Sequence, residues 1–396
     1  MEWVLNQTQT ILLALGVFFT GTLLHGRVFL LRKFNIPEPV IGGLFIACFF
    51  AFLFYRYGVT VQIDTHIRDD LMLVFFATVG LNARLTLFKK GGPKLLLFLG
   101  VAIACVFLQN AVGVGLAKLF GIHPLLGLIA GSITMTGGHG TGASYATKFA
   151  HIDGAMEIAM ACATCGLVMG GLIGGPLAEW LIAKYQLAPE DKVKNPDEAL
   201  EAHGFHEPEL VTTSSLLQIL GLTMLAVVSG RYLYSHIGEQ AKVPEFIFVM
   251  FIAIAITNLN LWWKKVDIQT QSLNLVNMMS LSLFLSIAMM SLRLWHLVDL
   301  ALPLLVIMMA QVLTICLFSY YVTFRVLGRD YDAVTIVCGH CGFGLGATPT
   351  ALANVESLTN RYGPAPSALF IVLIVGAFFI DIINAVVIQC YLSFMG

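Results

Sequence analysis

The sequence predicts an all-α integral membrane protein with ten transmembrane helices, arranged as two inverted five-span repeats that each carry a glycine-rich re-entrant hairpin. Three observations predict this: an apolar composition, recurring apolar runs, and motifs that return in the second half. Of 396 residues, 58% are hydrophobic and 11% are charged, and the mean hydropathy is +0.85. Soluble domains carry about 25% charged residues. Lipid is therefore the main solvent of this chain.

Apolar runs long enough to cross a bilayer recur along the whole chain. About 20 helical residues span the roughly 30 Å of hydrocarbon. The first run follows an uncharged polar segment and lacks a small-residue cleavage site, so we expect a retained span and not a removable signal. The ten predicted spans lie near residues 11–31, 40–55, 71–88, 95–118, 156–183, 212–234, 245–262, 273–292, 300–324 and 366–392.

The lysines and arginines predict how these spans are oriented. With the amino terminus outside, the inner loops hold fifteen of the 22 Lys and Arg residues, and the outer loops hold seven. The positive-inside rule then places both termini on the outer side of the membrane. This count requires the glycine-rich stretches at 125–150 and 333–354 to enter and leave on the same side.

A polar segment divides the chain near its middle. Residues 189–209 hold seven of the 23 acidic residues and no apolar run, which is typical of a solvated linker. We therefore expect a first repeat at 1–186, a cytoplasmic linker at 187–211 and a second repeat at 212–396.

Short motifs of the first half return in the second at near-constant spacing, which indicates duplication. Because each copy holds five spans, the second copy enters the membrane upside down. Inverted repeats are typical of secondary transporters, whose binding site lies at the repeat interface near the middle of the membrane. The recurring pairs are Pro37-Glu38 with Pro244-Glu245 (207 residues apart), Phe75–Val79 with Leu283–Ile287 (208), and Gly138-His139 with Gly339-His340 (201).

The two glycine-rich stretches are expected to form re-entrant hairpins. They read GSITMTGGHGTGA from Gly131 and CGHCGFGLGATPT from Cys338. Each glycine disfavours a helix by about 1 kcal/mol and frees backbone groups, which membrane depth tolerates only inside protein or beside a polar cavity. Hairpin tips that meet in mid-membrane offer carbonyls to a hard cation and helix amino termini to an anion. The alternative is that the glycines only let helices pack closely, which leaves the interleaved Thr and His and the helix-ending Pro349 unexplained.

The polar and glycine residues of these stretches are the candidate ligands. His139 and His340 each have three possible roles: substrate donor, proton relay or structural hydrogen-bond former. For the substrate we expect Ser132, Thr134, Thr136, Gly137, Gly138, His139, Gly140, Thr141, Gly339, His340, Gly342, Gly344, Thr348 and Thr350. For the cation we expect Thr136, Gly140, Gly344, Gly346, Asp381 and Asn384.

Asp381 is an ionisable residue in the middle of the last predicted span. Asn384 follows three residues later and therefore lies on the same helix face. A charge at membrane depth is costly and is a functional candidate by default. Pairing in assembly, coordination of a cation and binding of a substrate ammonium group all remain open for Asp381.

Several other classes of protein lack support in the sequence. The net charge of −1 provides no footprint for nucleic acid. The two Cys-x-x-Cys pairs, at Cys162 and Cys338, fall in membrane segments without a second ligand pair, so no transition-metal site is expected. Neither a nucleophile elbow nor an ATP-binding phosphate loop occurs, so we expect no enzyme and no ATP-driven pump. An ion channel is the remaining alternative class.

The quoted motifs resemble the glutamate:sodium symporter family of bacteria. The resemblance runs from Pro37-Glu38-Pro39-Val40 through both glycine-rich stretches to Gly376–Asp381. It implies a ten-span carrier of the bacterial inner membrane with re-entrant loops from opposite sides, similar in fold to sodium/citrate carriers. It also implies elevator-type homodimers that take up L-glutamate with Na+ as coupling ion and without a cofactor. A sodium-coupled carrier of another small carboxylate is the alternative.

Overall fold

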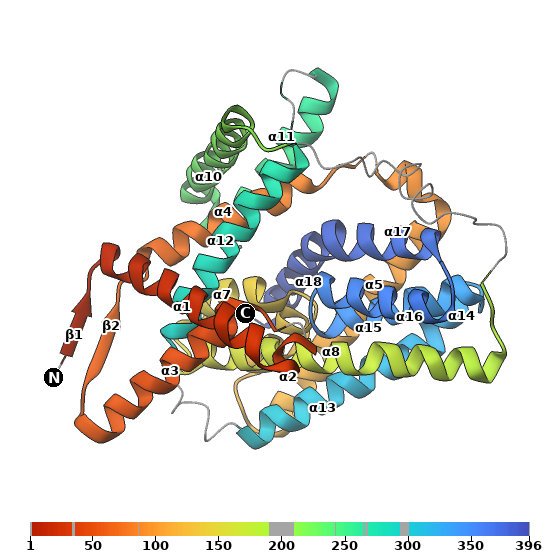
Figure 1. Cartoon of the computed structure of the whole chain (residues 1–396), viewed down its shortest axis with the longest axis horizontal. Helices are drawn as coiled ribbons and strands as arrows, with labels where there is room; N and C mark the ends of the chain where they lie inside the picture. Colours follow the sequence, from red (N-terminus) through yellow and green to blue (C-terminus); the bar gives the residue numbers. More distant parts are fainter. Residues whose placement is uncertain are drawn as a thin grey trace. The chain divides into compact units, whose positions relative to one another are not determined.

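The computed structural model describes nearly all of the membrane-embedded chain, and these residues are almost entirely helical (Figure 1). Most of the expected linker at 187–211 lies outside the described residues. Five of the charges that predict the orientation, Lys192, Lys194, Lys242, Lys264 and Lys265, lie outside them too. The described residues are 2–33, 36–85, 87–189, 210–241, 243–263, 266, 268–293 and 301–395.

The chain forms two compact units, and each unit combines sections from both halves of the sequence. The division into repeats at 1–186 and 212–396 concerns the order along the chain and stays a prediction. The first unit comprises Met1–Arg84, Ala143–Glu157 and Pro208–Asp299; the second comprises Leu85–Gly142, Ile158–Glu207 and Leu300–Gly396.

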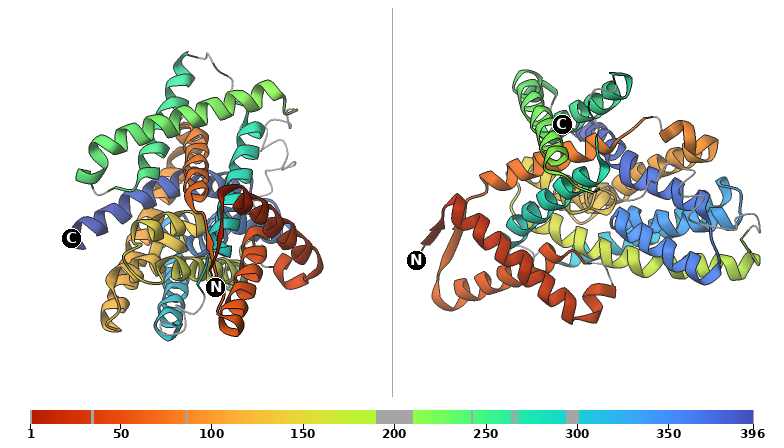
Figure 2. Two further views of the ribbon diagram at one scale, coloured as in Figure 1. Left: turned by 90° about the vertical axis from the view of Figure 1, so that its left-hand side faces the viewer. Right: turned by 45° about the horizontal axis from the view of Figure 1, so that its top comes forward.

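The first unit is a set of helices packed through small residues. Helices α4, α11 and α12 lie side by side (Figure 1, Figure 2). A β-carbon on Gly80 of α4 would lie 2.7 Å from the β-carbon of Ala253 in α11, so glycine is required for this close approach. The helices of the unit are α1 (Gln7–Arg27), α2 (Phe29–Lys33), α3 (Glu38–Tyr57), α4 (His66–Asn82), α10 (Thr213–Ala241), α11 (Glu245–Trp263) and α12 (Thr270–Met290).

Within the ranges that the structure describes, two short strands accompany the helices. β1 (Glu2–Leu5) pairs in parallel with β2 (Thr60–Ile63), and Glu2 is opposite Thr60 (Figure 1). β1 precedes α1 and β2 follows α3, so the pairing returns the chain to its starting end after two helices. This arrangement agrees with two successive membrane crossings.

The second unit contains the second glycine-rich stretch and the first one up to Gly142, and each stretch forms a pair of helical segments; the end of α7, from Ala143 on, belongs to the first unit. Helix α5 (Leu87–Leu119) bends at Gly92, where φ is +63°, next to Pro93. The remaining elements are α6 (Pro124–Leu128), the π-helix η1 (Ile129–Ile133), the start of α7 (Gly138–Lys148), α8 (Ala155–Tyr185), α13 (Ala301–Phe318), the π-helix η3 (Ser319–Thr323), α14 (Phe324–Val326), α15 (Tyr331–Leu345), α16 (Thr348–Tyr362), α17 (Pro366–Ile374), the π-helix η4 (Val375–Phe379) and α18 (Ile380–Met395).

The apolar helices confirm a multi-pass membrane protein. Among the described residues, seven helices are long and apolar enough to cross a membrane. An eighth span results if Pro366–Ala377 and Ile380–Met395, which meet at 46°, are taken together. Of the other two predicted spans, 245–262 coincides with a shorter apolar helix, Glu245–Asn260, and 71–88 with the 17-residue α4. The count of ten spans therefore stays a prediction.

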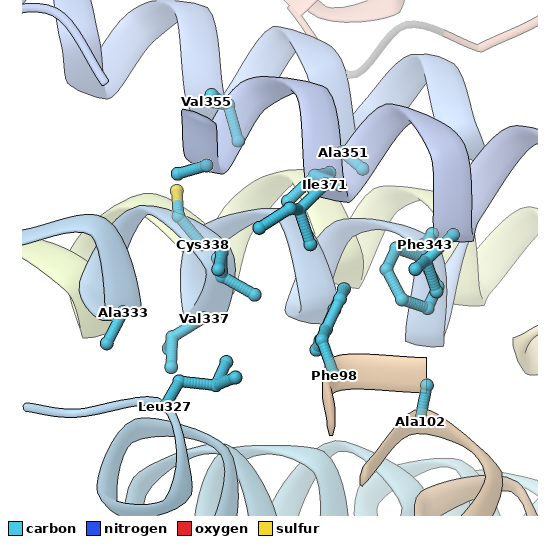
Figure 3. Packing of buried hydrophobic residues seen from close by; sticks show 14 of the residues in the cluster. Phe98, Ala102, Leu327, Ala333, Val337, Cys338, Phe343, Ala351, Val355 and Ile371 are labelled. Atoms are coloured by element: carbon cyan, nitrogen blue, oxygen red, sulfur yellow. The ribbon is translucent and has the colours of Figure 1, made fainter. Parts of the chain in front are cut away.

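Helices α15, α16 and α17 pack side by side around an apolar cluster (Figure 1). Every residue of α15 except Asp332 is buried, as expected for a helix that is apolar on all sides. Phe98 of α5 packs edge-on against Phe343 of α15, with ring centroids 5.9 Å apart (Figure 3). At the open end of the helix pair, the Tyr331 hydroxyl donates to the Gly363 carbonyl at 2.6 Å.

Asp330 caps the amino terminus of α15, which makes a prediction about stability. Its Oδ1 accepts a hydrogen bond from Ala333 N at 2.6 Å, and its Oδ2 lies 3.2 Å from Lys94 Nζ. Asp330→Ala should lower the free energy of unfolding by about 0.5–2 kcal/mol through loss of the cap. Asp330→Asn keeps a capping oxygen and removes only the partly exposed ion pair, so it should cost less. Thermal unfolding in detergent measures the difference, and equal losses in both variants would contradict the cap.

Candidate functional site

The first glycine-rich stretch is a helix interrupted twice. Its first arm, formed by α6 and η1, loses helical geometry at Gly131, where ψ is −139°. The chain then turns at Thr136 and Gly137, and α7 begins at Gly138 with a φ of +64°. Glycine adopts a positive φ at little cost, whereas residues with a β-carbon do not. Within the stretch at 125–150 the chain thus turns at residues 136–138, and the re-entrant hairpin itself stays a prediction.

Asparagines from two other helices hold the broken backbone at Ser132. Oδ1 of Asn110 in α5 accepts from Ser132 N, and Nδ2 of Asn384 in α18 donates to the Ser132 carbonyl, both at 2.9 Å. All three residues are completely buried. An unpaired buried backbone group costs about as much as a lost hydrogen bond. The asparagines therefore stabilise a break that would otherwise be unfavourable.

The second glycine-rich stretch has a single break, between α15 and α16. Gly346 and Ala347 separate the two helices, and Pro349 lies in the first turn of α16, where its missing N–H is tolerated. The helical arms, Tyr331–Leu345 and Thr348–Tyr362, extend beyond the expected hairpin at 333–354. Both helices continue because residues beyond the glycines, such as Tyr331 in α15 and Leu358 in α16, pack in the same apolar cluster.

Glycines inside α15 remain helical, contrary to the expectation that dense glycines break the helix. A β-carbon on Gly342 would lie 2.7 Å from the backbone N of Ala351, and one on Gly339 would lie 2.5 Å from Val372 Cγ1. A β-carbon on Gly344 would lie 2.9 Å from Ile315 Cδ1. These three glycines admit neighbouring helices, which is the close-packing alternative. Packing outweighs their low helix propensity.

Two breaks lie close together within the second unit: the turn of the first stretch at residues 136–138 and the break of the second stretch at Gly346 and Ala347. A β-carbon on Gly138 would lie 3.3 Å from the carbonyl oxygen of Gly346. Helix α7 begins at Gly138 and helix α16 begins at Thr348. The amino ends of two helices therefore lie close together, and each carries partial positive charge. Such a place suits a carboxylate.

Gln109 of α5 joins the two breaks directly. Its Nε2 donates to the Gly344 carbonyl at 2.5 Å, and its Oε1 accepts from Thr136 Oγ1 at 2.7 Å. Gln311 of α13 in turn donates from Nε2 to the Gln109 carbonyl at 2.8 Å. Gln109 and Gln311 are buried, with exposures of 1% and 0%. This chain of amides fixes the position of one break relative to the other.

His139 lies beside the first break with a defined tautomer. Its Nε2 is 3.0 Å from Thr164 Oγ1, and that hydroxyl donates its only proton to the Met160 carbonyl at 2.8 Å. Thr164 must therefore accept, so the proton of His139 is on Nε2. His139 is 6% exposed. This position is compatible with either a substrate contact or a structural role.

His340 lies within an aromatic cluster in the arm of α15. Its Nδ1 is 3.0 Å from Thr323 Oγ1. Its ring centroid lies 5.4 Å from that of Phe98 and 5.2 Å from that of Phe343, and the residue is 1% exposed. These contacts favour the structural role over the substrate donor or proton relay.

Some of the other candidate residues form hydrogen bonds within the fold, and others have polar side-chain atoms without a partner among the described residues. Thr134 donates to the Ile129 carbonyl at 2.7 Å and Thr348 to the Gly376 carbonyl at 2.5 Å. Thr350 Oγ1 is buried and has no hydrogen-bond partner among the described residues. Gly140 and Thr141 are buried in α7. No ion pair or hydrogen bond of the Asp381 carboxylate occurs within the described part of the chain.

Gln109, Asn110 and Gln311 are site residues that sequence reasoning did not assign. A signal for them exists in the sequence. Gln109 and Gln311 are uncharged polar residues inside apolar spans, 202 residues apart, which is nearly the spacing of the two Gly-His pairs. A buried amide in a membrane helix needs partners, and the repeat spacing indicates where they lie.

Comparisons with known proteins identify the family. The sequence profile described as "Sodium/glutamate symporter" matches residues 3–364. A sodium/glutamate symporter of Escherichia coli (strain K12) is 43% identical over 392 residues, which are 96% of this chain and 97% of the relative. One of Haemophilus influenzae is 40% identical over 396 residues, 98% of each chain.

Solved structures include a weaker match, the sodium proton antiporter of Methanocaldococcus jannaschii. It has a TM-score of 0.40 at 14% identity over 98% of each chain, which supports no inference. The profile match and the identities over nearly full length suffice on their own. They confirm the expected resemblance: this chain belongs to the sodium/glutamate symporter family, whose members are transporters and not enzymes.

Proposed function

We propose that this protein is a secondary active transporter that takes up L-glutamate together with Na+ across the bacterial inner membrane. Membership of the sodium/glutamate symporter family over residues 3–364 supports the proposal. Na+ is the coupling ion, and transport needs no cofactor. The apolar spans provide the multi-pass membrane domain.

The meeting of the two backbone breaks carries this proposal. Gly138 approaches the Gly346 carbonyl, and Gln109 joins Thr136 to Gly344. Glutamate has two carboxylates, and two helix amino ends lie near each other here. No Lys or Arg side chain is needed to neutralise an anion if helix ends and Na+ do so. The candidate residues from Thr136 to Thr141, with Gly346, Thr348 and Thr350, are assigned to this place, whereas His340 and the glycines inside α15 support it by packing.

The inverted repeat, the ten spans and the re-entrant hairpins are part of the proposal. In each half, three helices are followed by a long helix, a broken helix pair and a last helix, which supports duplication. In the first half these are α1, α3, α4, α5, α6–α7 and α8. In the second half they are α10, α11, α12, α13, α15–α16 and α17–α18.

The way in which the halves share the two units supports an elevator mechanism as part of this proposal. The first unit takes the first three helices of each half, and the second unit takes the long helix and the backbone break of each half, while α7 passes into the first unit at Ala143. One unit that holds both breaks can carry a bound substrate while the other remains fixed in the membrane. The homodimer and the outward orientation of both termini belong to the same proposal.

Sodium-dependent uptake of labelled L-glutamate into proteoliposomes tests this function. We expect uptake that requires an inward Na+ gradient and is inhibited by unlabelled glutamate more strongly than by aspartate, citrate or proline. A labelled-for-unlabelled exchange without a gradient should also occur, because a carrier exchanges substrate and a channel does not. Uptake that is indifferent to Na+ would contradict symport, and stronger inhibition by citrate would assign another carboxylate.

A further inference from the structure

We infer that the side-chain oxygens of Ser132 and Asn384 form a cation site next to the interruption at Gly131. This site holds the Na+ that drives transport. The inference rests on the proposed sodium coupling and specifies where the ion is bound. Ser132 Oγ and Asn384 Oδ1 belong to completely buried residues, and neither atom has a hydrogen-bond partner in the described part of the chain.

The hydrogen bond between Asn384 and Ser132 determines which side-chain atom of the asparagine has no partner. Nδ2 of Asn384 donates to the Ser132 carbonyl, so its Oδ1 is the free atom. Reversing the amide would place oxygen against oxygen. The same hydrogen bond holds Asn384 Oδ1 beside Ser132, whose own hydroxyl is unpaired. Two unpaired oxygens thus belong to two buried residues that a hydrogen bond joins.

Leaving these oxygens unpaired is costly, which indicates an absent ligand. A buried polar group without a partner costs about 1–3 kcal/mol, and native proteins contain few such groups. Gln311 Oε1 is another unpaired buried oxygen of the second unit, and its amide nitrogen donates to the carbonyl of Gln109, the neighbour of Asn110. Hydroxyl and amide oxygens are ligands of hard cations.

Asp381 supplies the negative charge that neutral oxygens lack. It precedes Asn384 by three residues on α18, so the two side chains share a helix face and their Cα atoms are about 4.5 Å apart along the axis. Within the described residues, no cation neutralises this carboxylate. A bound Na+ would neutralise Asp381 and satisfy Asn384 and Ser132 together.

Ser132→Ala is the sharpest test, because it removes the unpaired hydroxyl and no hydrogen bond of the described structure. In purified protein without Na+, this variant should unfold at the same temperature as the wild type or higher. Its stabilisation by NaCl, measured against choline chloride at constant ionic strength, should require roughly tenfold to hundredfold more Na+. Asn384→Ala should shift the sodium response in the same direction.

Ser286→Ala is the matched control. Ser286 Oγ is also buried and unpaired but lies on α12 of the first unit, so its sodium response should equal that of the wild type. A Ser132→Ala response within about threefold of the wild type, with wild-type uptake still dependent on Na+, would overturn this site and leave the proposed function intact. A wild type that Na+ neither stabilises nor activates would overturn both.

Discussion

Gly138→Val is expected to reduce glutamate uptake at least tenfold while the protein still inserts into the membrane. Gly138 has a φ of +64°, and a β-carbon there would lie 3.3 Å from the Gly346 carbonyl. A left-handed conformation costs a residue with a β-carbon about 1–2 kcal/mol, and a β-branched residue is a genuine outlier there. Since about 1.4 kcal/mol is a factor of ten in an equilibrium constant, this strain is large enough to displace the start of α7 and weaken substrate binding by that factor.

The expected loss arises at the tip and not in the core. Valine can relieve its strain only by moving the start of α7 away from Gly346, which separates the two helix amino ends. Substrate affinity should therefore fall while the thermal unfolding temperature changes little. Initial uptake rates in proteoliposomes, over a range of glutamate concentrations, measure this effect.

Gly175→Val provides the control for added bulk. Gly175 lies in α8, and a β-carbon there would meet no atom within 4 Å, so near-normal uptake is expected. If Gly138→Val also transports normally, the meeting of the two breaks is not the substrate site.

Asp381→Asn is expected to weaken activation by Na+ at least tenfold. The amide keeps the shape of the carboxylate but cannot neutralise a bound cation. An ion that loses a charged partner loses more than about 1.4 kcal/mol, a factor of ten, when water is excluded. Uptake as a function of Na+ concentration, at saturating glutamate, measures the change.

Glu356→Gln removes one negative charge at an exposed position of α16 and serves as the control for net charge. Its sodium activation should match that of the wild type. Wild-type sodium activation in Asp381→Asn would instead leave the other two roles open from the sequence, pairing in assembly and binding of a substrate ammonium group. Reduced expression with normal sodium activation of the remaining protein would indicate the same.

The membrane class and the helical content could be predicted because both depend on composition and local pattern. Apolar runs of about 20 residues form helices in lipid whatever their neighbours are, since backbone groups must be paired within the segment. Seven of the ten predicted spans coincide with long apolar helices. The family could also be identified, because the motifs around Gly138 and Gly339 are specific.

The position of each break could be predicted only approximately. Glycine frequency marked both stretches, yet Gly342 and Gly344 remain in α15 while Gly346 interrupts the chain. The difference in helix propensity is about 1 kcal/mol per glycine, which packing against Ala351 and Ile315 exceeds. Helix propensity therefore does not predict which of the four glycines of the second stretch interrupts the helix.

The sequence by itself determined that this chain is a helical membrane protein with two glycine-rich stretches and a carboxylate in its last span. Only the tertiary structure decided that Asn110 and Asn384 bind the backbone N–H and the carbonyl of the same residue, Ser132, and that Gln109 joins the two breaks. Local pattern determines which segments are helical, because helical hydrogen bonds connect near neighbours. Hydrogen bonds between residues more than 200 positions apart, such as that between Ser132 and Asn384, depend on how the helices pack.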